Sequence, residues 1–122
     1  MLFEKRMVMA LKKNPLKLNK LQLRTLLLMQ ELARHPETAT LEPASGDVTL
    51  TALPRPHGNH VHIGSFVVAA SDISGFSNEA VWRALERKGL ARSNFPLAIT
   101  LTAAGVGYDT GLTEHLAQPS DH

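Results

Sequence analysis

Apolar residues in this chain recur with two different periods, and this mixture constrains the fold more than any other feature. In 19–33 and 78–88 they return at the spacing of an amphipathic helix. Elsewhere apolar and polar residues alternate, as they do in half-buried strands, at 48–53, 60–63 and 97–101. Helices combined with short alternating strands predict an α+β fold.

The length of the chain permits one such domain. Its 122 residues, of which 43% are apolar and 20% charged, are enough to bury a core and lack the composition of a disordered protein. We therefore expect a single domain over 1–117, in which 1–17 forms an N-terminal arm or helix. The remaining 118–122 should be a disordered tail.

Local signals mark the ends of the helices. Asn19 and Gln22 have the spacing of a capping box, and Ser77 is a suitable N-cap for the second helix. Gly89 supplies the left-handed stop of that helix, and Thr102 can cap a short third helix. One face of the second helix should enter the core through Val81, Trp82 and Leu85.

The strands are expected to form a hairpin. Turn residues fill 54–59, so 48–53 should pair with 60–63 across them. The stretch 35–47 is rich in Pro, Ser, Thr and Gly and indicates a loop. The run 65–70 fits a strand or a helix, because a run this short shows too little periodicity to distinguish between them.

Charge is distributed unevenly along the chain. Residues 1–34 carry eight basic and two acidic side chains, whereas 35–122 carry five basic and nine acidic ones. The nearly neutral total therefore hides a basic N-terminal third, which is the part suited to an anionic partner.

The complete absence of cysteine excludes disulfides, thiolate zinc sites and cysteine nucleophiles. The longest apolar run, 26–29, is far shorter than the roughly 20 residues of a membrane span, and the basic start lacks a signal-peptide core. We expect a cytoplasmic protein without membrane contact. Neither a nucleophile elbow nor a phosphate-binding glycine loop occurs, so we also expect that it is not an enzyme.

A resemblance to a known family lies in 75–90, which reads Gly-Phe-Ser-Asn-Glu-Ala-Val-Trp-Arg-Ala-Leu-Glu-Arg-Lys-Gly-Leu. This resembles the turn and recognition helix of winged-helix regulators. The later 101–105, Leu-Thr-Ala-Ala-Gly, is similar to the Leu-Thr-x-x-Gly that follows the wing in multiple-antibiotic-resistance-type repressors. The resemblance implies a winged-helix-like domain, to which the sequence patterns add an extra β-hairpin and a basic N-terminal helical segment. It also implies a second helix over 65–71, a wing within 91–101 and dimers formed through terminal helices.

Nucleic-acid binding is the function that the resemblance implies. Exposed residues of the second helix and of the wing would then contact DNA: Asn78, Arg83, Arg87, Lys88 and Arg92. Asparagine can read adenine and arginine can read guanine, while lysine and arginine neutralise phosphates. Glu79 and Glu86 share the helix and would repel phosphates.

More positive charge than the second helix carries lies before the first helix and within it, at Lys5, Arg6, Lys12, Lys13, Lys17, Lys20 and Arg24. Electrostatic attraction of this kind dominates nonspecific affinity for DNA. Duplex DNA is therefore the expected partner. The alternative is that the helix face and the basic arm are simply solvated and keep the protein in solution.

Three of the six histidines lie close together in the sequence, at His57, His60 and His62. On a strand, His60 and His62 project from the same face, and the adjoining turn would bring His57. Three imidazoles can bind zinc or another divalent metal, with water in the fourth position. Otherwise no cofactor is expected. The alternative is a polar hairpin face whose histidines meet solvent.

A third hypothesis is a non-catalytic interaction protein. The N-terminal segment carries apolar residues that need a cover: Met1, Leu2, Phe3, Met7, Val8, Met9 and Leu11. They can pack on the protein's own core or on a second copy. We expect a homodimer, which agrees with what the resemblance implies.

Overall fold

The structure is a computed structural model that describes residues 14–55, 58–64 and 66–112. Its helices are α1 (Lys20–Leu32), the 3₁₀ helix η2 (Ala70–Ser77), α2 (Glu79–Arg87) and α3 (Ala103–Gly107). Its strands are β1 (Ala39–Glu42), β2 (Asp47–Leu50), β3 (His60–Ile63), β4 (Phe66–Ala69), β5 (Ala91–Asn94) and β6 (Ala98–Leu101). The predicted α+β class is confirmed. None of the helices in these stretches is both long and apolar enough to cross a bilayer.

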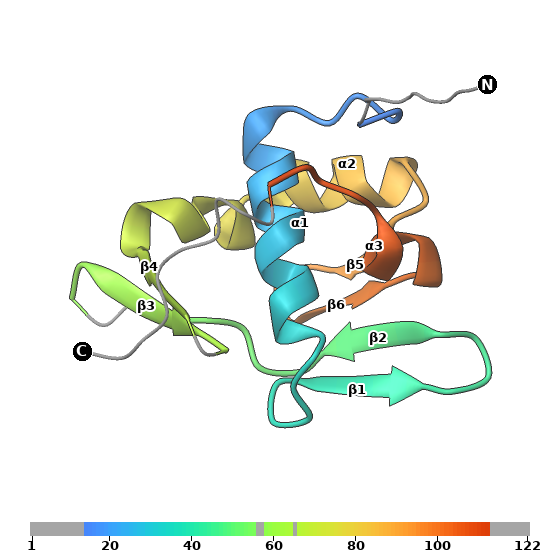
Figure 1. The fold of residues 1–122 in the computed structure, drawn as a ribbon, viewed down its shortest axis with the longest axis horizontal. Coiled ribbons are helices and arrows are strands. Elements are labelled where there is room, and N and C mark those ends of the chain that lie inside the picture. The colour runs from blue at the N-terminus through green and yellow to red at the C-terminus, as the bar shows by residue number, and fades with distance from the viewer. Residues whose placement is uncertain (1–13, 56–57, 65, 113–122) are drawn as a thin grey trace, which may run out of the picture.

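The strands form two separate antiparallel sheets. Four strands are ordered β1-β2-β6-β5, and β3 pairs with β4 in a two-stranded ribbon. Helix α1 runs through the middle of the molecule, with the larger sheet on one side and the ribbon on the other (Figure 1). On the larger sheet, Thr49 lies opposite Thr100, and their hydroxyls are 2.8 Å apart.

The predicted pairing of 48–53 with 60–63 is wrong. Strand β2 pairs instead with β1 and β6, while β3 pairs with the strand that follows it. The expected loop over 35–47 is also wrong, because it contains β1. Only the first residue of β1 is buried, so this strand shows no alternation that the sequence could reveal.

The first helix forms as its sequence predicts. The capping box is confirmed: the Gln22 N–H donates to Asn19 Oδ1 at 2.8 Å, and the Asn19 N–H donates to Gln22 Oε1 at 2.9 Å. The inner side of α1 is buried from Thr25 to Met29. This side joins the sheet and α2 in one apolar cluster, which contains Leu26, Leu28, Met29, Leu50, Ile63, Leu85, Ile99 and Leu101.

Residues 66–69 do not form the helix that the resemblance implies over 65–71. Phe66–Ala69 is strand β4, whose β-branched Val67 and Val68 lie opposite His62 and Val61. The chain then enters η2, which packs closely on α1. A Cβ at the buried Gly75 would overlap Thr25, so this contact requires glycine.

Helix α2 begins one residue later than its sequence indicates. Asn78 is the N-cap, since its side chain accepts from the Ala80 N–H at 3.0 Å. The predicted cap, Ser77, ends η2 and directs its hydroxyl to the Ser74 carbonyl. The core position of Trp82 is confirmed, because the residue is fully buried and its ring packs edge-on against Phe95.

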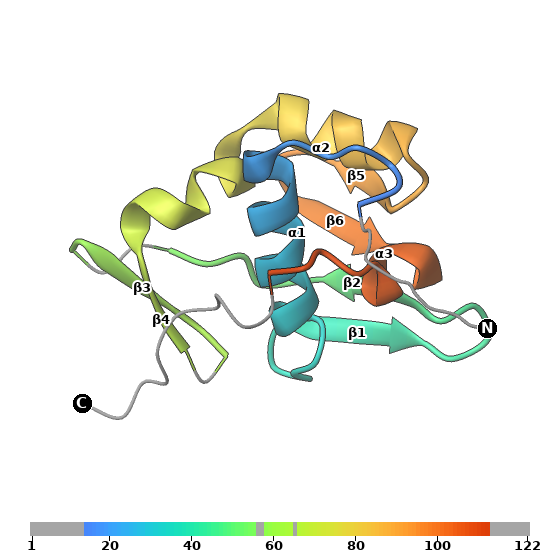
Figure 2. The ribbon, with the colours of Figure 1, turned by 45° about the horizontal axis from the view of Figure 1, so that its top comes forward.

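The β5–β6 hairpin leads directly into α3. The expected cap of this short helix is confirmed, since the Gly105 N–H donates to Thr102 Oγ1 at 3.1 Å. Gln30 of α1 holds the other end of the helix by donating to the carbonyls of Gly105 and Tyr108. Figure 2 shows α3 beside α1, as these hydrogen bonds require.

Candidate nucleic-acid interface

Helix α2 separates its apolar and charged residues completely between two faces. Its inner face is buried and consists of Val81, Trp82, Ala84 and Leu85. Its outer face is exposed and carries Glu79, Arg83, Glu86 and Arg87, followed by Lys88 at the C-cap. Three of the predicted DNA-binding residues therefore do lie on one solvent-exposed helix surface.

Arg83 has a partner on its own helix. Its Nη2 lies 3.1 Å from Glu79 Oε2, and both side chains are at least half exposed. An exposed pair one helical turn apart contributes only about 0.3–0.5 kcal/mol. Arg83 can therefore exchange Glu79 for a phosphate at little cost in stability.

Arg87 and Lys88 carry the less compensated charge at the end of α2. Both are exposed, and no ion pair among the described residues involves either of them. Arg87 lies in the last turn, where the helix dipole favours a cation. The C-terminal end of α2 therefore presents two cations to solvent.

Asn78 and Arg92 are engaged in structural contacts. The side-chain oxygen of Asn78 accepts the hydrogen bond that caps α2, so this oxygen already has a partner within the fold. Arg92 reaches from β5 to β2, where its Nη1 lies 2.8 Å from Asp47 Oδ2. Both residues help to hold the fold, which the sequence did not indicate.

Asp47 is the residue that sequence reasoning missed. Its second carboxylate oxygen accepts from the Ala103 N–H at 3.1 Å, so it joins β2 to α3 as well as to β5. The Arg92 guanidinium beside it holds the pKa of the Asp47 carboxyl below the ordinary value of 3.8. No local signal marks this role, because the partners of Asp47 lie 45 and 56 residues away.

The segment before α1 supplies further positive charge. Figure 1 and Figure 2 both draw it beside α2, and its Lys17 is exposed, as is Lys20 in the first turn of α1. Arg24 pairs with Asp72 of η2 at 3.0 Å. The other predicted basic residues lie outside the described residues, namely Lys5, Arg6, Lys12 and Lys13. Residues 1–13 of the expected N-terminal arm lie outside them too, as do the apolar residues proposed to support a dimer and the tail 118–122.

The histidine hypothesis concerns a different part of the molecule. His60 and His62 share the outer face of β3, and their ring centroids are 5.2 Å apart in an edge-on arrangement. His57 lies outside the described residues. Over the parts of the chain that the structure describes, no three His, Asp or Glu side chains gather as a metal site would need. Zinc binding at His57, His60 and His62 stays a prediction.

A hydrogen-bonded pair of side chains lies near the turn of the same ribbon. Glu31 of α1 is almost fully buried, and its Oε2 lies 3.0 Å from His35 Nε2. Gly64, between β3 and β4, approaches both side chains so closely that a Cβ there would meet them. This arrangement fixes the ribbon against the end of α1, which is a structural role.

A comparison with known proteins finds no matching family model, no matching curated protein and no matching solved structure. The winged-helix resemblance therefore remains a prediction from the sequence. Any functional argument has to rest on the residues described above.

Proposed function

We propose that this protein binds duplex DNA, in the cytoplasm, through the outer face of α2. The observation that carries the proposal is the distribution of residues on this helix. Its inner face is wholly buried, while Arg83, Arg87 and Lys88 point to solvent from the outer one. A rigid helix that presents several cations is suited to phosphate contact and to insertion in the major groove.

The balance of charge at this face supports the proposal. Glu79 is engaged by Arg83, and two cations at the end of the helix have no ion-pair partner among the described residues. Lys17, on the segment before α1, and Lys20, in the first turn of α1, are exposed and add positive charge outside α2. Glu86 is the one acidic side chain of α2 that no ion pair in the described parts neutralises.

The neighbouring elements are also compatible with this role. Helix α2 leads into the β5–β6 hairpin, which spans the residues where the winged-helix resemblance implies a wing, although the helix that it implies over 65–71 is replaced by β4 at 66–69. The functions of Asn78 and Arg92 in the fold limit the proposed contact residues to Arg83, Arg87 and Lys88, with Lys17 and Lys20 beside them.

The proposal is tested by measuring binding to a fluorescently labelled duplex across a salt series. We expect affinity to fall steeply with salt, and the double substitution Arg87→Ala/Lys88→Ala to weaken binding. Loss of two phosphate contacts should reduce the slope of log affinity against log salt by about 1.8. The matched control is Arg34→Ala, an exposed arginine that follows the far end of α1. Equal effects of the double variant and the control, or no binding at low salt, would refute the proposal.

A second variant tests the same face in the opposite direction. Glu79→Gln removes a negative charge and releases Arg83, so it should strengthen binding to the duplex. Folding is little affected, since the pair is exposed and the N-cap is provided by Asn78. Unchanged affinity in this variant would mean that DNA does not approach this face.

A further inference from the structure

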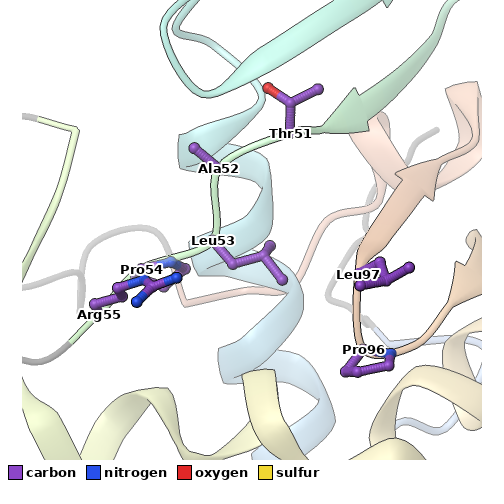
Figure 3. Close-up of a pocket in the computed structure, with 7 residues that line it drawn as sticks. All are labelled: Thr51, Ala52, Leu53, Pro54, Arg55, Pro96 and Leu97. Atoms are coloured by element: carbon purple, nitrogen blue, oxygen red, sulfur yellow. The ribbon is translucent and has the colours of Figure 1, made fainter.

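A hollow of about 490 Å³ lies beside the turn of the β5–β6 hairpin, and no residue of α2 is among the described residues that line it. Two segments far apart in the sequence form its walls, namely 51–55 after β2 and 96–97 between β5 and β6. Figure 3 shows these segments facing each other across the hollow. Its volume is in the range of pockets that hold small organic molecules.

Leucine and proline side chains form the apolar part of the walls of this hollow. Leu97 is 75% exposed, the highest value among the large apolar residues of the described chain, and it stands on one wall. Leu53 extends toward it from the other segment (Figure 3). Pro54 and Pro96 add rigid rings whose backbone is already fixed. A ligand that covered these side chains would remove apolar surface from water at a small cost in ordering the protein.

The charge of the lining selects the kind of ligand. Among the described residues that form the hollow, Arg55 is the one that carries a charge, and none has a carboxylate. It is exposed and takes part in no ion pair among the described residues. Figure 3 places it at the opposite end from Leu97. A guanidinium binds a carboxylate or sulfonate through paired hydrogen bonds.

We propose that this hollow binds a small organic acid. The apolar body lies against Leu53 and Leu97, and the acid group is bound by Arg55. The proposal goes beyond DNA binding and does not depend on it, since it concerns different residues and needs no nucleic acid.

The test uses 1-anilinonaphthalene-8-sulfonate, which combines an aromatic body with a sulfonate, in a titration followed by its fluorescence. We expect saturable binding at one site and competition by decanoate. Arg55→Ala should weaken the affinity about 10-fold or more, because it removes a charged hydrogen-bond donor. N-phenyl-1-naphthylamine, which lacks the sulfonate, should bind more weakly by a similar factor, and that difference should disappear in Arg55→Ala.

Matched controls separate this site from general adsorption. Leu97→Ala should weaken the sulfonate several-fold, whereas Leu41→Ala removes another exposed leucine, on β1, and should have no effect. Arg34→Ala is the corresponding control for Arg55. All four positions are exposed, so each variant should fold. Loss of binding in the controls to the same extent, or unchanged binding in Arg55→Ala, would overturn the proposal.

Discussion

Replacement of Gly105 by alanine should destabilise this protein far more than an ordinary substitution in a short helix. Gly105 is buried in α3, and a Cβ there would overlap the carbonyl oxygen of Leu90. That oxygen belongs to the backbone and accepts from the Thr102 N–H at 3.0 Å, so it cannot rotate away as a side chain would. The helix has to move instead.

The size of the effect follows from the contacts that the movement disturbs. Overpacking in a filled interior costs about 1–3 kcal/mol. Displacement of α3 also weakens the hydrogen bond from Gln30 to the Gly105 carbonyl, 2.9 Å long, which is worth about 1 kcal/mol. Alanine recovers up to about 1 kcal/mol through its better helix propensity. The gain in helix propensity offsets the lost hydrogen bond, so the free energy of unfolding should fall by about 1–3 kcal/mol, which lowers the melting temperature by roughly 4–12 °C.

Gly107 provides a matched control in the same helix. No atom lies within 4 Å of a Cβ built there, so Gly107→Ala gains helix propensity without any overlap. Urea unfolding followed by circular dichroism would compare the two variants with the parent protein. If Gly105→Ala were as stable as Gly107→Ala, the close approach of α3 to Leu90 would not exist in solution.

Three further substitutions test other parts of the fold. Thr25→Val should raise the free energy of unfolding by about 1 kcal/mol in the same urea assay, because the buried Thr25 hydroxyl finds no hydrogen-bond partner among the described residues; a loss of stability would reveal a missed partner. Asp47→Asn should be less stable than the parent at neutral pH. Because the folded-state pKa of Asp47 is lowered, its stabilisation is present above the ordinary value of 3.8 and is lost as pH falls through the folded-state value, so the gap should close in acid unfolding titrations. A gap that stayed constant would contradict this ion pair. Gly64→Ala should lower the free energy of unfolding by about 1–3 kcal/mol more than Gly58→Ala, measured by thermal unfolding. Both glycines have a positive φ, but only at Gly64 would the added Cβ overlap Glu31. Equal losses in the two variants would mean that the backbone conformation alone, and not this overlap, causes the loss.

The sequence located α1, α2 and α3 well because each of these helices carries its own signals, whereas η2 has no side-chain cap and was not predicted. The buried residues of α1 and its capping pair, Asn19 and Gln22, lie within one short segment. The helix can therefore be predicted from that segment alone. Trp82 was placed in the core for the same reason. The error of one residue at the start of α2 arose because Ser77 and Asn78 are both good caps, and only the course of η2 decides between them.

Strand partners could not be obtained in this way. Alternation within 48–53 records which side chains face the core, and it contains no information about the neighbouring strand. The nearest candidate in sequence was therefore chosen, whereas β6 lies about 50 residues away. Strand β1 escaped notice because an exposed edge strand needs no apolar pattern.

The candidate sites divide along the same line. The sequence by itself determined that Arg83 and Arg87 share the outer face of a helix, because residues four apart lie on one side of it. Only the tertiary structure decided that Arg92 is bound to Asp47, and that 51–55 and 96–97 enclose a hollow. The physical reason is that a periodic element specifies its own faces, while contacts between distant segments depend on how the whole core packs.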